Sequence, residues 1–320
     1  MAVELSLEPC VSPLWAPTGH AQTILGHLLP SPQLRDRGER VEVPLEDGDR
    51  LVGTRYAGGE KRVAYVFHGL GGTSDADYVR RTVLLCLKRG YTVYAMNHRG
   101  CGPGAGLAKL PYHSGRAEDL SAVIAWGRGR HPRARHAAVG FSLSANALLL
   151  LLGGQRGKTL PDYAIAFNAP IDLETCSRRL STRFNRIYDL RFVLQCRRDL
   201  VIKGLDGQYR VPIHTTVREF DQIYVAPAGG FRDREEYYET CSAGKYVDRI
   251  RTPTAVFHAE DDPIIPVKGY RDVSFSSNCL LHIEKVGGHM GYLSAKPTPL
   301  GTNRWQDYAL DRALAVLESA

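Results

Sequence analysis

Ser142 stands in a short motif of small residues that is typical of a serine nucleophile. Gly140 and Ser144 lie two positions before and after it, between a strand-like apolar run and a leucine-rich, helix-like run. A sharp turn from strand to helix exposes the side-chain oxygen of the middle residue, and only small neighbours fit at these two positions. Asn146 is too large to serve Ser144 in the same way, so the pattern favours Ser142. Such a pattern also occurs by chance, so partners are needed.

A serine hydroxyl becomes a nucleophile only when a base takes its proton and a third group orients that base. His289 lies in a glycine-rich loop after an apolar run, and Asp261 and Asp262 follow the preceding apolar run. The chain order serine, aspartate, histidine matches a known order of the catalytic triad. We choose Asp262 because it directly precedes a Pro-Ile-Ile-Pro stretch that should lead away from the strand end, and Asp261 is the alternative. Taken singly, such a histidine can be a turn residue and such acids can cap a helix.

Acyl transfer also needs N–H groups directed at the negative charge that develops on the carbonyl oxygen. A glycine-rich stretch at 68–72 follows an apolar run and can present the backbone N–H of Leu70. The residue after the nucleophile, Leu143, supplies a second N–H, and we expect these two groups to form the oxyanion hole. The glycines at 100–106 do not match a dinucleotide-binding pattern, and the chain has neither a phosphate-binding loop nor an H-E-x-x-H motif. We therefore expect no cofactor and no metal.

The elements that position these residues alternate between apolar strands and helices. An Asp-Gly turn at 47–48 predicts an antiparallel hairpin of edge strands at 41–45 and 51–56. Short apolar strands separated by helices indicate an α/β fold with a mostly parallel sheet that helices cover on both faces. The expected strands are 63–67, 91–96, 137–139, 164–167, 253–257 and 280–286, and the expected helices include 78–89, 116–126, 146–152 and 304–317.

The alternation stops between residues 171 and 250, where charged and aromatic residues follow a helical period. We expect a core formed by residues 1–170, with an N-terminal extension at 1–40, and by residues 251–320. The segment 171–250 is expected to form a helical lid over the carboxyl ends of the strands, where α/β sheets bind ligands. Its aromatic residues are candidates for an acyl pocket, although their spacing also suits core packing; they are Phe220, Tyr224, Phe231, Tyr237 and Tyr238.

The composition is that of an ordinary globular protein, with 43% hydrophobic and 23% charged residues and a mean hydropathy of −0.24. The longest aliphatic run, at 148–152, is too short to cross a bilayer, and the first eight residues lack the apolar core of a secretory signal. The seven cysteines are scattered and form no C-x-x-C pair, which argues against a disulfide framework and a zinc site. We expect a cytoplasmic protein with reduced thiols.

The net charge is +7, and several arginines gather between residues 178 and 198. A solvated basic face is the simplest interpretation of this segment, and peripheral contact with anionic lipid is the alternative. We expect no nucleic-acid partner, because no motif of a nucleic-acid-binding protein accompanies the charge.

Several motifs together resemble the α/β-hydrolase superfamily, and within it the YheT-like hydrolases that are related to the ABHD and Emb8-type proteins. They are G-H-x-Q-T at 19–23, H-G-L-G-G at 68–72, N-H-R-G-C at 97–101, G-F-S-L at 140–143 with Asn146, D-D-P at 261–263 and G-H at 288–289. The resemblance extends from about residue 13 to residue 310, and Ser144 and Ala145 depart from it where the family usually has two glycines.

The resemblance implies the α/β-hydrolase fold and a carboxylester hydrolase. In this family Ser142 would attack an ester carbonyl, His289 would act as general base and then general acid, and Asp262 would orient His289. The leading hypothesis is an esterase for short- to medium-chain acyl esters. One alternative is a phospholipase or lysophospholipase at membrane surfaces. Another is a binding protein that kept the fold without the chemistry, although the complete set of three residues speaks against it.

Overall fold

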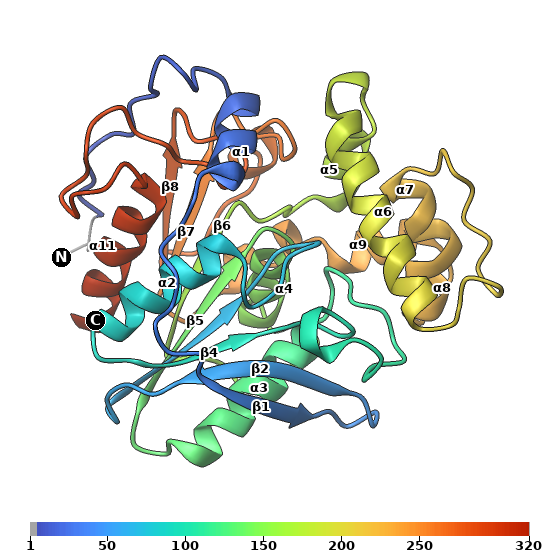
Figure 1. Cartoon of the computed structure of the whole chain (residues 1–320), viewed down its shortest axis with the longest axis horizontal. Coiled ribbons are helices and arrows are strands. Elements are labelled where there is room, and N and C mark those ends of the chain that lie inside the picture. Colours follow the sequence, from blue (N-terminus) through green and yellow to red (C-terminus); the bar gives the residue numbers. More distant parts are fainter. Residues whose placement is uncertain (1–4, 320) are drawn as a thin grey trace.

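A mixed sheet of eight strands forms the centre of the computed structural model, which describes residues 5–319 (Figure 1). The strand order is β1-β2-β4-β3-β5-β6-β7-β8. Neighbours from β4 to β8 are parallel, whereas β2 is antiparallel to both β1 and β4. The strands are β1 (Glu39–Pro44), β2 (Arg50–Tyr56), β3 (Arg62–Phe67), β4 (Thr92–Met96), β5 (Arg135–Phe141), β6 (Tyr163–Phe167), β7 (Thr254–Ala259) and β8 (Cys279–Glu284). The predicted α/β fold is confirmed.

The predicted hairpin is present as β1 and β2. Val43 pairs with Leu51 in the register of the two strands, and the N–H of Leu45 donates to the backbone oxygen of Asp49 at 2.9 Å. Gly48 closes the turn with a φ of +88°, which a residue with a side chain rarely adopts. The Asp-Gly signal therefore located this turn correctly.

Helices cover both faces of the sheet. Helices α2 (Asp77–Lys88) and α11 (Trp305–Ser319) pack on one face, and α3 (Ala117–Arg130) and α4 (Leu143–Leu152) pack on the other. Successive residues of a strand point to opposite faces, so β3 sends Ala64 and Val66 to one apolar cluster and Tyr65 and Phe67 to the other. This two-sided burial explains why the strands are continuous apolar runs.

Between β6 and β7 the described chain forms helices and no strand, and we call residues 171–250 the helical insertion. Figure 1 shows these helices gathered on one side of the molecule, apart from the sheet. Its main helices are α5 (Leu173–Leu180), α6 (Arg186–Ile202), α7 (Val217–Phe220), the π-helical turn η3 (Asp221–Val225), α8 (Ala226–Ala228) and α9 (Arg234–Cys241). The division into a core and a lid stays a proposal.

Among residues 5–319, no helix combines the length and the apolar character that crossing a bilayer requires. Residues 1–4 belong to the N-terminal stretch in which we expect no secretory signal, and they lie outside the described residues. The cytoplasmic location stays a prediction.

Candidate active site

Ser142 occupies the turn between β5 and α4 and has a φ of 52° and a ψ of −119°. This conformation is rare for a residue with a side chain, and such backbone strain is found mostly at functional sites. Gly140 permits the turn, because a Cβ there would lie 2.9 Å from the backbone oxygen of Ser144. The structure thus has the sharp strand-to-helix turn that the motif predicts.

The loops after β7 and β8 bring an acid and a base to this serine. Ser142 Oγ lies 2.9 Å from His289 Nε2, and His289 Nδ1 lies 2.8 Å from an oxygen of Asp262. In this geometry Nδ1–H can donate to the carboxylate, which leaves Nε2 free to accept the serine proton. The three residues therefore form a continuous chain of two hydrogen bonds, which we call the relay.

Asp262 is held as a buried carboxylate, with 4% of the residue exposed. Its Oδ1 accepts the backbone N–H groups of Ile264 and Ile265 at 2.8 and 2.9 Å, and Asn168 donates to Oδ2 at 2.9 Å. Burial alone would raise the pKa of Asp262, but the charge of a protonated His289 and its hydrogen bond lower that pKa to about 2. Asp262 is therefore ionised at neutral pH.

Asp261, the alternative acid, lies next to the relay without joining it. Its carboxylate accepts the backbone N–H of Gly288 at 2.8 Å, and burial raises its pKa. It therefore supports the loop that carries His289, whereas Asp262 contacts the imidazole itself.

Asn168 is a member of the site that the sequence analysis missed. It follows β6 directly with a φ of 48°, and its side-chain oxygen accepts the hydroxyl of Tyr292 at 3.0 Å. The bond from Tyr292 holds the amide of Asn168 so that its nitrogen donates to Asp262. Its position at a strand end, on the same sheet edge as the relay, was the available signal.

The predicted oxyanion hole consists of two backbone N–H groups, those of Leu70 and Leu143. Leu143 is the first residue of α4, and Leu70 lies in the loop after β3. Within residues 5–319, neither N–H donates to another group of the protein. Gly69 brings this loop against the nucleophile, since a Cβ on it would lie 2.9 Å from the Cβ of Ser142. The oxyanion hole stays a prediction, for which both N–H groups are available.

Ser144, the departure from the family pattern, joins the turn to the loop that carries Leu70. Its buried hydroxyl donates to the backbone oxygen of His68 and also contacts Nε2 of His98. Burial lowers the pKa of His98 well below its usual value, so the ring is neutral. Tyr112 stacks on that ring at 3.9 Å between centroids. A serine therefore fits in the place of the glycine and fastens two parts of the site.

Helix α1 (Gly19–Leu28) carries the G-H-x-Q-T motif and packs against the loop of His289. Thr23 Oγ1 accepts the N–H of His289 at 2.8 Å and donates to the backbone oxygen of Gly19 at 2.6 Å. The amide of Gln22 pairs with both backbone groups of Leu293, at 3.0 and 2.7 Å. The motif therefore braces the loop that presents the base.

Glycines make this close packing possible. A Cβ on Gly19 would lie 1.8 Å from the backbone oxygen of Asp261, and one on Gly288 would lie 2.3 Å from the backbone oxygen of Gly19. Thr23 and His289 are 266 positions apart in the chain. The motif was visible in the sequence, but residue types alone do not indicate a partner so distant.

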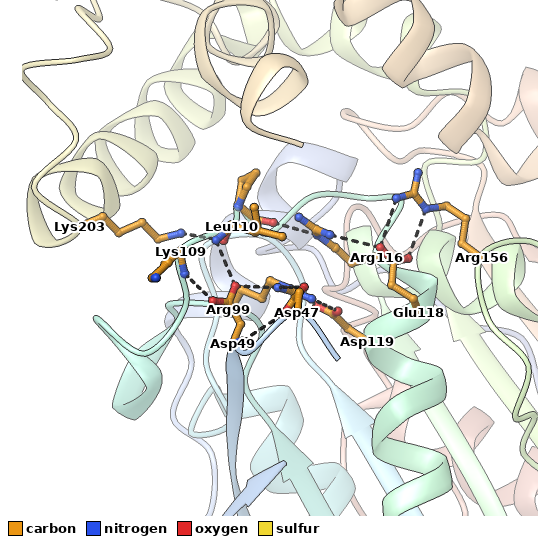
Figure 2. A network of polar contacts seen from close by, with 11 residues as sticks. Asp47, Asp49, Arg99, Lys109, Leu110, Arg116, Glu118, Asp119, Arg156 and Lys203 are labelled. Carbon is orange, nitrogen blue, oxygen red and sulfur yellow. Dashed lines mark hydrogen bonds and ion pairs between the residues drawn. The ribbon is translucent and has the colours of Figure 1, made fainter. Parts of the chain in front are cut away.

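Figure 2 shows a buried ionic cluster around Arg99, which follows β4. Its guanidinium pairs with Asp119 of α3 at 2.6 Å and with Asp47 and Asp49 of the β1–β2 turn at 2.7 Å each. These carboxylates offset the cost of burying the guanidinium. Lys203, directly after α6, donates to the backbone oxygen of Leu110 at 2.8 Å. The ion pairs thus join the β1–β2 turn, the segment after β4 and the first turn of α3.

Two cavities meet at the relay, and Leu70, Ser142 and His289 line both. The first, which we call the insertion cavity, has a volume of about 130 Å³ and extends under the helical insertion. The second, the α1 groove, runs between α1, the loop after β3 and α6. Four of the five predicted acyl-pocket residues lie on the wall of the insertion cavity: Phe220, Tyr224, Tyr237 and Tyr238.

Phe231 does not line the insertion cavity. It packs behind the wall, against the rings of His113 and Tyr237 at 5.3 and 5.2 Å between centroids. The π-helical turn η3 contributes Asp221, Tyr224 and Val225 to the wall, and such turns often occur at functional sites. Among residues 5–319, no group of three or more His, Cys, Asp or Glu side chains is placed to hold a metal ion.

No family model matches the chain. The Escherichia coli (strain K12) protein described as "Putative esterase YheT" is 32% identical over 294 residues, which cover 86% of this chain and 84% of that protein. The chain belongs to the YheT-like family of α/β-hydrolases.

Other matches agree with this family. The monoacylglycerol lipase of Saccharomyces cerevisiae is 28% identical over 273 residues, which cover 80% of this YheT-like chain and 59% of the lipase. The solved structure of the Pyrococcus furiosus esterase Pf2001 superposes with a TM-score of 0.59 at 16% identity and covers 97% of this chain and 98% of its own. At that identity, the second likeness shows the α/β-hydrolase fold alone.

Proposed function

We propose that this α/β-hydrolase is a serine carboxylester hydrolase that acts on short- to medium-chain acyl esters through an acyl-enzyme. Membership of the family makes the chain an ester hydrolase, and the triad and the substrate range are what the proposal adds. The observation that carries it is the relay from Ser142 through His289 to Asp262, in a site where the N–H groups of Leu70 and Leu143 have no hydrogen-bond partner among residues 5–319. A binding protein without chemistry would have no need of that relay.

In the first step, Oγ of Ser142 attacks the carbonyl carbon while Nε2 of His289 takes the hydroxyl proton. The N–H groups of Leu70 and Leu143 stabilise the oxyanion. His289 then gives its proton to the alcohol oxygen as the C–O bond breaks, which leaves the acyl group on Ser142. Water attacks this acyl carbon, with His289 again as base, and the acid and the free serine are released.

The two cavities suit the two sides of the ester bond. The wall of the insertion cavity is mainly apolar and aromatic, which favours an unbranched acyl chain there. The α1 groove reaches Ser142 from the other side and is where we place the alcohol. A lipid ester is the second candidate substrate, because exposed apolar side chains surround this groove.

The proposal is tested with the p-nitrophenyl esters of acetate, butyrate and octanoate and with a lysophospholipid. We expect wild-type protein to hydrolyse at least one of them and Ser142→Ala to hydrolyse none. The profile of kcat/KM against chain length then distinguishes an esterase from a lipase. Folded wild-type protein without turnover, or Ser142→Ala with full turnover, contradicts the proposal.

A further inference from the structure

Helix α6 is apolar on two opposite faces. Its inner face contributes Tyr188, Val193 and Leu200 to the buried side of the insertion. Its outer face carries four large apolar side chains that are exposed, Ile187 (65%), Leu190 (43%), Leu194 (57%) and Val201 (60%). Their spacing of three, four and seven residues places them in one stripe along the helix. A surface helix normally has a polar outer face, so this stripe needs something to cover it.

The same stripe is basic. Arg191 and Arg198 lie between its apolar residues, and both are exposed. Within the described part of the chain, neither has a carboxylate within ion-pair distance, whereas Arg186 pairs with Asp189. The segment 178–203 holds eight basic and two acidic residues, so most of the net charge of +7 lies here. An anionic surface is the matching partner.

The stripe extends to the α1 groove. Ile187 and Arg191 belong to the outer face of α6 and also line the α1 groove, which reaches Ser142. Ile24 and Leu28 of α1 line the same groove and are exposed on the other side of it. Apolar surface thus continues from α6 across the groove to α1.

We propose that the outer face of α6 docks on the surface of a lipid bilayer that contains anionic lipids. An exposed apolar stripe with interspersed arginines is the pattern of helices that lie in the interface between headgroups and acyl chains. Such docking would place the α1 groove at the bilayer. The delivery of an ester from the bilayer to Ser142 rests on the function proposed above, whereas the docking itself does not.

A second copy of the chain is a poorer partner. In a symmetric pair built on this face, the same patch meets itself, so Arg191 and Arg198 would face a second set of arginines. Repulsion between them opposes the pairing, whereas anionic headgroups attract both residues.

The test is cosedimentation with vesicles of phosphatidylcholine alone or mixed with phosphatidylglycerol. We expect wild-type protein to bind the mixed vesicles and to bind the neutral ones much less. The variant Leu190→Gln/Leu194→Gln should weaken binding by about tenfold or more. Arg198→Gln, which removes one exposed arginine of the stripe, should weaken binding several-fold. The control is Leu14→Gln/Arg133→Gln, which removes one exposed leucine and one exposed arginine outside α6 and should bind like wild type.

Turnover of p-nitrophenyl butyrate by each variant serves as the check on folding and on the chemistry, because the substituted side chains line neither cavity. Wild-type protein that binds no vesicles, or variants that bind as tightly as wild type, would overturn the docking proposal while leaving the esterase proposal intact. A dimer in sedimentation velocity that Leu190→Gln/Leu194→Gln converts to a monomer would also overturn it, in favour of a second copy.

Discussion

A substitution of Asp262 tests the proposed catalytic role with little change in the size of the side chain. The substitution Asp262→Asn keeps the size of the side chain but removes the negative charge that orients His289 and stabilises its protonated form. We expect kcat for p-nitrophenyl butyrate to fall by roughly 10⁴-fold with the fold unchanged. Asp261→Asn is the matched control, because its carboxylate contacts the backbone of Gly288 and not the imidazole. Equal losses in the two variants would contradict the assignment of Asp262.

Asp221 gives a prediction about stability and pH. It is half-buried on the wall of the insertion cavity and accepts the hydroxyl of Tyr238 at 2.7 Å, and desolvation raises its pKa to about 7. In the unfolded chain its pKa is near 3.8, so the contribution of Asp221 to stability is highest below that pH and is lost as the pH rises to about 7. Asp221→Asn should therefore raise the melting temperature at pH 8 more than at pH 4. Asp75→Asn, with a side chain that is 78% exposed, is the control; a difference that does not grow with pH would count against this account.

At the scale of elements, α1 acts as a brace for the catalytic loop, and Thr23 is the contact that tests it. Thr23→Val keeps the shape of the side chain but removes the oxygen that accepts the N–H of His289. Leaving this N–H without a partner should disturb the position of the imidazole and lower kcat by about tenfold or more, with KM little changed. Thr23→Ser, which keeps the oxygen, should restore most of the rate. If Thr23→Val lowered the melting temperature but left kcat intact, α1 would have a structural role only.

We place substrate preference on the part of the insertion-cavity wall that η3 contributes. Tyr224 lies on this wall and Phe231 lies behind it, so the two residues form a natural comparison. Tyr224→Ala enlarges the insertion cavity and should raise the ratio of kcat/KM for octanoate to that for acetate by roughly fivefold. Phe231→Ala should lower stability and leave the ratio near that of wild type. A uniform loss on every ester in Tyr224→Ala would assign this tyrosine to packing.

At the scale of the whole molecule, the sequence predicted what depends on local pattern. The alternating strands and helices, the hairpin at Gly48 and the turn at Ser142 follow from residue types over short stretches. What it could not predict are contacts between segments that are distant in the chain. Thr23 reaches His289, and Ser144 reaches His68, only because the sheet order places their loops together. The sequence showed that Ser144 replaces a glycine of the family pattern, but it did not show which residues the serine hydroxyl contacts.

The uneven charge of the molecule leads to a prediction about salt. Outside residues 178–203 basic and acidic residues nearly balance, so electrostatic attraction to a surface should act through α6 and its neighbours. Raising the salt concentration from about 0.05 to about 0.5 M shortens the Debye length and screens this attraction. Turnover of an ester presented in phosphatidylglycerol vesicles should therefore fall several-fold, while turnover of p-nitrophenyl acetate stays within about twofold. If both rates fell together, salt would be acting on the active site, and if neither changed, the arginines of α6 would contribute nothing to the capture of substrate.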